Sequence, residues 1–215
     1  MSFSTFSNKH INRWQDYLKS HPPKLRLLDA DSSVMLVTSL IVGIGAGLGA
    51  VVFRRLIDWL HNFAYSDIAG ILSDWYPLHL ILIPALGGAI VGPLVYYFAP
   101  EAKGHGVPEV MEALELRGGK IRPRVVVIKS LASSVCIASG GSVGREGPIA
   151  QIGSALGSLV GQVLKLSEDR VRTLVACGAA GGIAATFNAP IAGAVFALEV
   201  LLRRFGSVYF GAVVI

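Results

Sequence analysis

The residues best suited to chemistry lie in residues 129–151, where charged side chains interrupt long apolar runs. Lys129 sits inside one apolar run, and residues 144–148 read GREGP with Glu146 at the centre. Charged side chains are costly in lipid, so they usually face the protein interior and mark ion or proton paths. Glu146 is therefore the first candidate for a transport residue.

Glu146 is expected at the start of a helix. Pro148 follows it in an apolar run over residues 147–164, and proline favours the first helical turn. At membrane depth, the free NH groups of that turn and the positive end of the helix dipole would favour a bound anion. The carboxylate could occupy the anion's place and swing away once protonated, acting as both plug and proton carrier. An ordinary acidic helix start at the membrane surface is an equally open alternative.

The composition indicates a membrane protein. Hydrophobic residues make up 53% of the chain and charged residues 15%, whereas soluble domains carry about 25% charged residues. The net charge is +5, but the basic residues lie in short segments between apolar runs, so no nucleic-acid partner is expected. Cys136 and Cys177 lie in apolar segments without metal-like spacing, which indicates packing.

Two apolar runs, residues 34–53 and 78–98, are long enough to span a bilayer. Residues 54–77 between them are predicted as a more polar connection with a solvated His61. Trp59, Trp75 and Tyr76 occupy the places of interfacial aromatics in this connection. Later apolar segments are short and broken by glycine and proline, as in discontinuous helices that line a cavity. These segments cover residues 125–138, 147–164, 173–187, 191–202 and 208–215.

The distribution of Lys and Arg predicts a cytoplasmic N-terminus. Five precede the first span, two lie between the spans, and five fall in residues 100–124. Residues 1–33 lack the apolar centre of a signal peptide. A cytoplasmic amphipathic helix at the interface is predicted there, with a disordered tail as the alternative.

Two further motifs flank residues 129–151. Residues 104–108 read GHGVP, a loop that can bring backbone NH groups close to a ligand before a proline-led helix. His105 could donate to an anion or sense pH, although a solvated loop histidine is the more ordinary interpretation. Residues 187–190 read FNAP, and Glu199 beyond them is expected to pair with Arg203. Three acids are expected to face water or nearby cations: Glu109, Glu112 and Glu115.

Together the three motifs resemble the CLC family of chloride channels and chloride/proton antiporters. They occur in the family's order, with Lys129 at the family spacing, and the likeness covers residues 34–215. The resemblance implies the first half of an inverted-repeat CLC fold, working as a homodimer in a lipid bilayer. It also implies that Glu146 is a gating glutamate, which competes with the anion and exchanges protons. The anion-site positions that it implies are Gly104, His105, Gly106, Val107, Pro108, Gly144, Arg145, Gly147, Pro148 and Ile149.

Three departures from the family pattern bear on function. His105 stands where serine is usual, which leaves a fluoride-selective branch open. Val200 stands where antiporters usually have an inner proton-transfer glutamate, and valine carries no proton, which favours a channel-like mode. The second half, with its GxFxP motif and pore tyrosine, does not occur in the 215 residues. A fragment of a longer protein is expected, with a truncated product as the alternative.

The predicted fold class is an all-α, polytopic membrane protein with broken, tilted helices. The predicted function is transport of chloride or a similar small anion gated by Glu146, with chloride/proton antiport and a non-transporting interaction subunit as alternatives. Bound chloride would be substrate, and no cofactor or metal is expected. An enzyme is not expected, because Ser142 has no evident base partner. We expect a multi-pass protein of the plasma (inner) membrane with two parts, residues 1–33 and 34–215.

Overall fold

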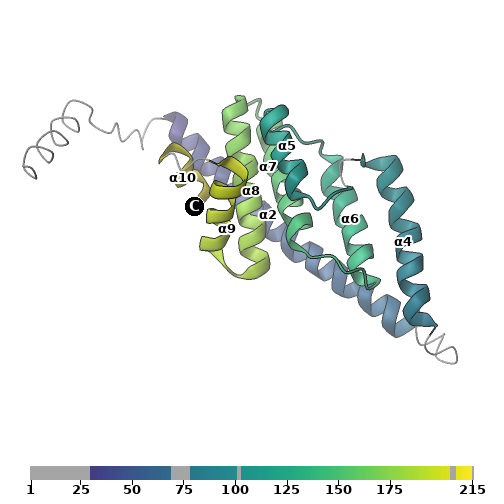
Figure 1. Ribbon diagram of the computed structural model, residues 1–215. Helices are drawn as coiled ribbons and strands as arrows, with labels where there is room; N and C mark the ends of the chain where they lie inside the picture. Colours follow the sequence, from purple (N-terminus) through teal and green to yellow (C-terminus); the bar gives the residue numbers. More distant parts are fainter. Residues whose placement is uncertain (1–29, 69–77, 101–102, 204–206, 215) are drawn as a thin grey trace, which may run out of the picture. The chain divides into compact units, whose positions relative to one another are not determined.

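The computed structural model of the protein describes residues 30–68, 78–100, 103–203 and 207–214 (Figure 1). Every element among these residues is helical, in agreement with the predicted all-α class. The chain divides into Met1–Val34 and Met35–Ile215, and the site described below belongs to the second unit. The amphipathic helix predicted within residues 1–33, Trp75 and Tyr76 fall outside the described residues, except that residues 30–33 begin a helix.

Helix α2, Ala30–Asn62, is longer than the sequence predicted. The predicted polar connection after Phe53 is wrong for its first part, because the helix continues and passes into the π-helix η1, Phe63–Ile68. Residues 54–62 contain no glycine or proline to stop the helix, and Ile57 is buried in the same cluster as Phe53. The helical stretch is long and apolar enough to cross a membrane.

Helix α4, His79–Phe98, coincides with the second predicted span and is long and apolar enough to cross a membrane. It packs against α6, Arg124–Ala138, through a cluster that includes the buried residues Val95 and Ala132. Large apolar side chains such as Ile81 remain exposed on α4. An apolar outer face of this kind is what a lipid-facing helix needs.

Helices α7, Glu146–Val163, and α8, Glu168–Phe187, run side by side and antiparallel (Figure 1). A β-carbon at Gly153 would lie 2.7 Å from the carbonyl carbon of Gly178, and one at Gly178 would lie 2.6 Å from that of Gly153. The two glycines therefore let the backbones touch, as small residues do in membrane helix pairs. Similar contacts join Gly157 to Leu174 and Gly161 to Val171.

The predicted run over residues 191–202 forms two elements, α9, Pro190–Phe196, and the π-helix η4, Ala197–Leu202. The expected pair of Glu199 with Arg203 is wrong, since no ion pair joins these two described residues. Arg203 has a φ of 50° and ends the helix, and the wider π-helical turn removes the usual i,i+4 alignment. The last helix, α10, covers Ser207–Val214.

Candidate functional site

Helix α7 begins at Glu146, as the sequence predicted. Its first helical hydrogen bond runs from the NH of Ile149 to the carbonyl oxygen of Arg145 over 3.0 Å. The amides of Glu146 and Gly147 come before that bond, and Pro148 has no NH. The side chain of Glu146 is exposed and folds back so that its carboxylate lies where a β-carbon at Gly144 would be.

The GHGVP loop lies directly against this helix start. Gly106 has a φ of 100°, and a β-carbon there would lie 2.8 Å from the carbonyl carbon of Gly147. A β-carbon at Gly147 would in turn lie 2.9 Å from the carbonyl carbon of His105. Only glycine combines that backbone conformation with so close an approach. The two motifs, far apart in sequence, are therefore in contact.

This contact brings two helix starts together. Helix α5, Val107–Leu116, begins immediately after Gly106, and α7 begins immediately before Gly147. Each start contributes amide groups and the positive end of a helix dipole. Two such ends at one place favour a bound anion. We call residues 104–108 and 144–149 the helix-start junction.

Two side chains hold the GHGVP loop in this position. The NH of Gly106 donates to Oε2 of Glu109 over 2.8 Å, which is the half of a capping box that the N3 glutamate supplies at the start of α5. Lys129, only 3% exposed, donates from Nζ to the carbonyl oxygen of Gly104 over 2.7 Å. The expectation that Glu109 faces water is therefore wrong, and a helix-capping residue followed three positions later by Glu was the sequence signal for its role. Glu112 does pair with Arg117, at 2.6 Å.

The residues predicted around the anion divide into exposed and buried ones. Gly104, His105, Gly144 and Arg145 are exposed, and His105 meets Gly147 through its carbonyl group rather than its imidazole. Pro148 and Ile149 are buried, and Val107 packs into an apolar cluster. At the contact with Gly147 the junction is thus built from backbone groups, while its apolar side chains anchor it to the core.

No sequence pattern indicated that the end of α2 and η1 hold the end of α6. The hydroxyl of Tyr65 donates to the carbonyl oxygen of Ser139 over 3.1 Å. Nδ1 of His61 lies 3.1 Å from the carbonyl oxygen of Ala138. The prediction that His61 is merely solvated is therefore incomplete. These contacts fix the helix end from which residues 140–145 lead to Glu146.

The FNAP break lies at the same end of the α7–α8 pair as Glu146. Gly182 of α8 packs on Ile149, since a β-carbon there would lie 2.9 Å from Cγ2 of that residue. Helix α8 then ends at Asn188, whose φ is 53°, and Pro190 opens α9. All three sequence motifs thus lie at one end of the pair. No three His, Cys, Asp or Glu side chains gather into a metal-binding group among the described residues.

Known proteins match this chain over most of its length. A family model described as "Voltage gated chloride channel" matches residues 87–215. The H(+)/Cl(-) exchange transporter ClcA of Klebsiella pneumoniae (strain 342) is 37% identical over 191 residues, which cover 84% of this chain and 39% of that protein. The putative chloride channel protein ClcB-like of Ralstonia nicotianae is 34% identical, covering 81% and 42%. The chain therefore spans about two fifths of the length of these curated relatives.

Solved structures give a related picture. A slow cyanobacterial Cl-/H+ antiporter is similar with a TM-score of 0.70 and 30% identity, over 84% of this chain and 43% of that one. A CLC-type fluoride/proton antiporter is similar with a TM-score of 0.66 over 87% of this chain and 46% of that one. At 24% identity the second likeness concerns the fold alone.

Proposed function

Because the chain belongs to the voltage gated chloride channel family, we propose that it forms the first half of a transporter that exchanges chloride for protons across a membrane. The valine at position 200 favoured a channel-like mode on sequence grounds. The names of its relatives support the exchange alternative instead, since they include H(+)/Cl(-) exchange transporters and a Cl-/H+ antiporter. An exchanger of this sequence would have to move protons without a glutamate at position 200.

One observation carries the proposal, namely the contact of Gly106 with Gly147 at the helix-start junction. It supports an anion site because the positive ends of α5 and α7 meet there. The carboxylate of Glu146 lies against Gly144 at the edge of the same junction. A chloride ion and this carboxylate would thus compete for the same amide groups.

Protonation of Glu146 would decide the competition. The helix dipole and first-turn amides would attract the ionised carboxylate, by about 0.3–1 kcal/mol at an exposed position and up to about 2 kcal/mol at a partly buried one. A protonated carboxyl group loses this attraction and moves aside. Chloride then enters the site, and the side chain carries the proton away from it. Completion of the pore by a second, inverted half would exclude water and strengthen each of these interactions.

The remaining expectations form part of the same proposal. We place the N-terminus and residues 117–123 on the cytoplasmic side, because Lys and Arg concentrate there. The exposed apolar faces of α2 and α4 would contact lipid. A homodimer in the plasma (inner) membrane, with chloride and protons as the transported species, completes the assignment.

Proton movement driven by a chloride gradient tests the proposal. The intact protein is reconstituted into liposomes, and wild type is compared with Glu146→Gln, Glu146→Ala and the control Glu112→Gln, which alters an exposed acid outside the junction. We expect wild type and the control to pump protons uphill, and both Glu146 variants to move chloride without protons. Chloride flux without proton movement in wild type would contradict exchange. Unchanged proton pumping in both Glu146 variants would contradict the gate.

A further inference from the structure

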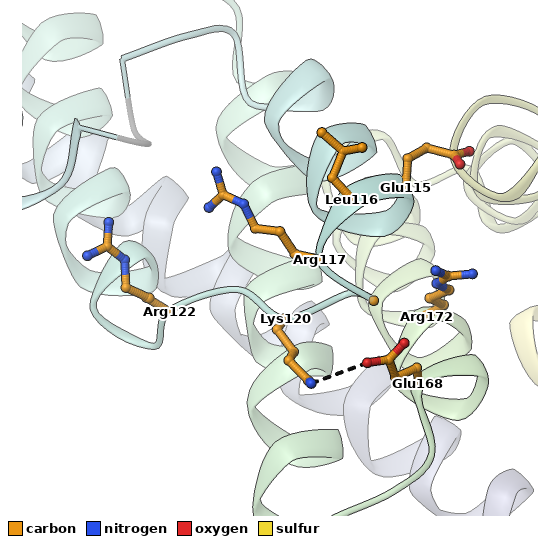
Figure 2. A pocket seen from close by; sticks show the side chains of 8 residues that line it. Glu115, Leu116, Arg117, Lys120, Arg122, Glu168 and Arg172 are labelled. Atoms are coloured by element: carbon orange, nitrogen blue, oxygen red, sulfur yellow. Dashed lines mark hydrogen bonds and ion pairs between the residues drawn. The ribbon is translucent and has the colours of Figure 1, made fainter.

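A basic cavity lies at the opposite end of the α7–α8 pair from Glu146. About 530 Å³ in volume, it opens between the end of α5, the linker of residues 117–123 and the start of α8 (Figure 2). Four cations line it against two carboxylates. The cations are Arg117, Lys120, Arg122 and Arg172, and the carboxylates are those of Glu115 and Glu168.

We propose that this basic cavity binds the phosphate group of an anionic ligand. Guanidinium groups present planar, forked donors that match phosphate oxygens, and lysine adds a compact positive charge. Three of the four cations are arginines. Clusters of this kind beside membrane helices suit lipid headgroups as well as soluble phosphates.

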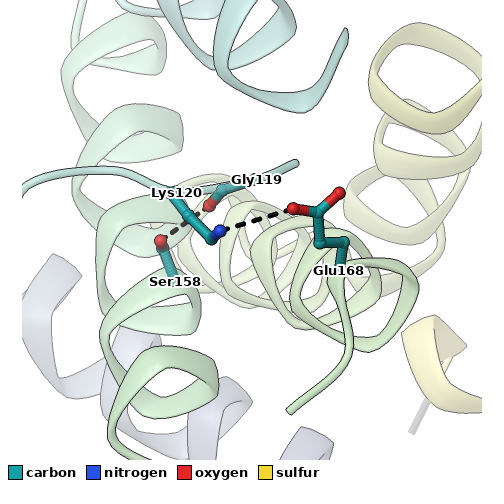
Figure 3. Close-up of polar contacts among 4 residues, drawn as sticks. All are labelled: Gly119, Lys120, Ser158 and Glu168. Carbon is teal, nitrogen blue, oxygen red and sulfur yellow. Dashed lines mark hydrogen bonds and ion pairs between the residues drawn. The ribbon is translucent and has the colours of Figure 1, made fainter. Parts of the chain in front are cut away.

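The linker that carries these cations is held on a fixed path. Gly118 and Gly119 both have positive φ values, 59° and 79°, and the NH of Gly119 donates to the carbonyl oxygen of Ala113 over 2.8 Å. The buried hydroxyl of Ser158 donates to the carbonyl oxygen of Gly119 over 2.6 Å (Figure 3). It also accepts from the NH of Ile121 over 2.8 Å. The cavity is therefore preformed by buried hydrogen bonds.

Three of the four cations, Arg117, Lys120 and Arg172, retain capacity for a ligand. Arg117 and Lys120 pair with Glu112 at 2.6 Å and Glu168 at 3.3 Å, but these side chains are at least half exposed. Exposed pairs of this kind contribute little and exchange readily. Nε of Arg172 is buried, and no hydrogen-bond partner for it lies in the described part of the chain. Arg172 as a whole is only partly buried and lines the cavity, so its positive charge attracts a phosphate placed there.

The position of the basic cavity separates it from the chloride site. Ser158, beneath the linker, is twelve residues along α7 from Glu146, which corresponds to about 18 Å. The linker also falls on the side that we propose as cytoplasmic. Leu116 lies at the cavity with 78% of its surface exposed, where an acyl chain could cover it. Phosphate binding here would therefore be a property additional to transport.

Thermal unfolding of the intact purified protein tests the proposal. One arm titrates inorganic phosphate against chloride at equal ionic strength in detergent. The other compares nanodiscs of phosphatidylcholine with nanodiscs that contain phosphatidylglycerol. The double variant Arg122→Gln/Arg172→Gln removes two lining cations, and Lys120→Gln removes an exposed third one. The matched control Lys165→Gln removes an exposed charge from the α7–α8 connection, outside the lining.

We expect phosphate, the anionic lipid or both to raise the unfolding temperature of wild type and Lys165→Gln. The double variant should bind the active probe about tenfold more weakly or worse, since it loses charge-assisted hydrogen bonds. A response only in nanodiscs identifies a lipid headgroup, and a response only to inorganic phosphate identifies a soluble ligand. If the double variant does not fold, weaker binding by Lys120→Gln supports the proposal. No wild-type response to either probe, or equal responses in folded lining variants and control, would overturn it.

Discussion

Nζ of Lys129 donates a 2.7 Å hydrogen bond to the carbonyl oxygen of Gly104, so a buried cation on α6 holds the first residue of the GHGVP loop. The carboxylate of Glu109 holds the same loop through the NH of Gly106. A loop fixed at two points can keep its backbone against Gly147 without help from its own side chains. The lysine thus acts on the proposed chloride site through the loop.

Replacing Lys129 by methionine should therefore loosen the junction. The change keeps most of the side-chain volume but removes a charge-assisted hydrogen bond, which is worth about 1.5–3 kcal/mol. We expect a lower unfolding temperature in detergent and slower chloride flux in liposomes. Lys129→Arg keeps a donor and should recover part of both losses. Wild-type flux and stability in Lys129→Met would show that the bond does not support the site.

Gly106→Ala should damage the junction more severely. A β-carbon at this position would meet the backbone of Gly147, and a φ of 100° is strained for alanine. We expect a destabilisation of about 1–3 kcal/mol and loss of most chloride flux. The control is Gly88→Ala in α4, where a β-carbon meets nothing within 4 Å. Equal behaviour of the two variants would argue against the close contact.

Gly144→Ala should move the gate while leaving the fold intact. A β-carbon at Gly144 would overlap the carboxylate of Glu146, the far end of a flexible side chain that can turn away at little cost. We expect an unchanged unfolding temperature, chloride flux that depends less on pH, and weaker proton coupling. Adding Gly144→Ala to Glu146→Gln should change flux no further. An additional change in the double variant would assign the effect to the loop backbone instead.

Residues that start or end helices made parts of this structure predictable from sequence. Pro148 and Pro190 mark the starts of α7 and α9, and Asn188 ends α8 in the left-handed conformation that asparagine tolerates. Lys129 also stood out, because a lysine inside an apolar run needs a partner. The identity of that partner was not predictable, since it depends on tertiary packing.

Other features depend on contacts between distant segments. Tyr65 reaches Ser139 across 74 residues, and no periodicity in either segment encodes that bond. The extension of α2 beyond Phe53 follows from burial of Ile57, which tertiary packing decides. The channel-like interpretation is not supported by the names of the relatives, and it had a different weakness. It rested on the single residue Val200, and one position does not determine a transport mode that many groups share.

Substitution of His105 tests the contribution of its side chain separately from that of the loop backbone. The imidazole is exposed, and the residue meets Gly147 through its carbonyl group, so His105→Ser and His105→Ala should leave the unfolding free energy within about 0.5 kcal/mol of wild type. Any change in transport then reports the imidazole alone. We expect His105→Ser to retain chloride-driven proton pumping and to shift the ratio of chloride to fluoride flux, measured in parallel liposome assays.

The two His105 variants also discriminate between roles of the side chain. A hydroxyl can donate to an anion whereas a methyl group cannot, so His105→Ala should transport chloride more slowly than His105→Ser if position 105 contributes a donor. Identical selectivity and rate in wild type and both variants would mean that the imidazole points away from the ion. The anion would then be held by the backbone of the helix-start junction, which the contact of Gly106 with Gly147 defines. Strong destabilisation by either variant would contradict the view that His105 supports the junction through its carbonyl group.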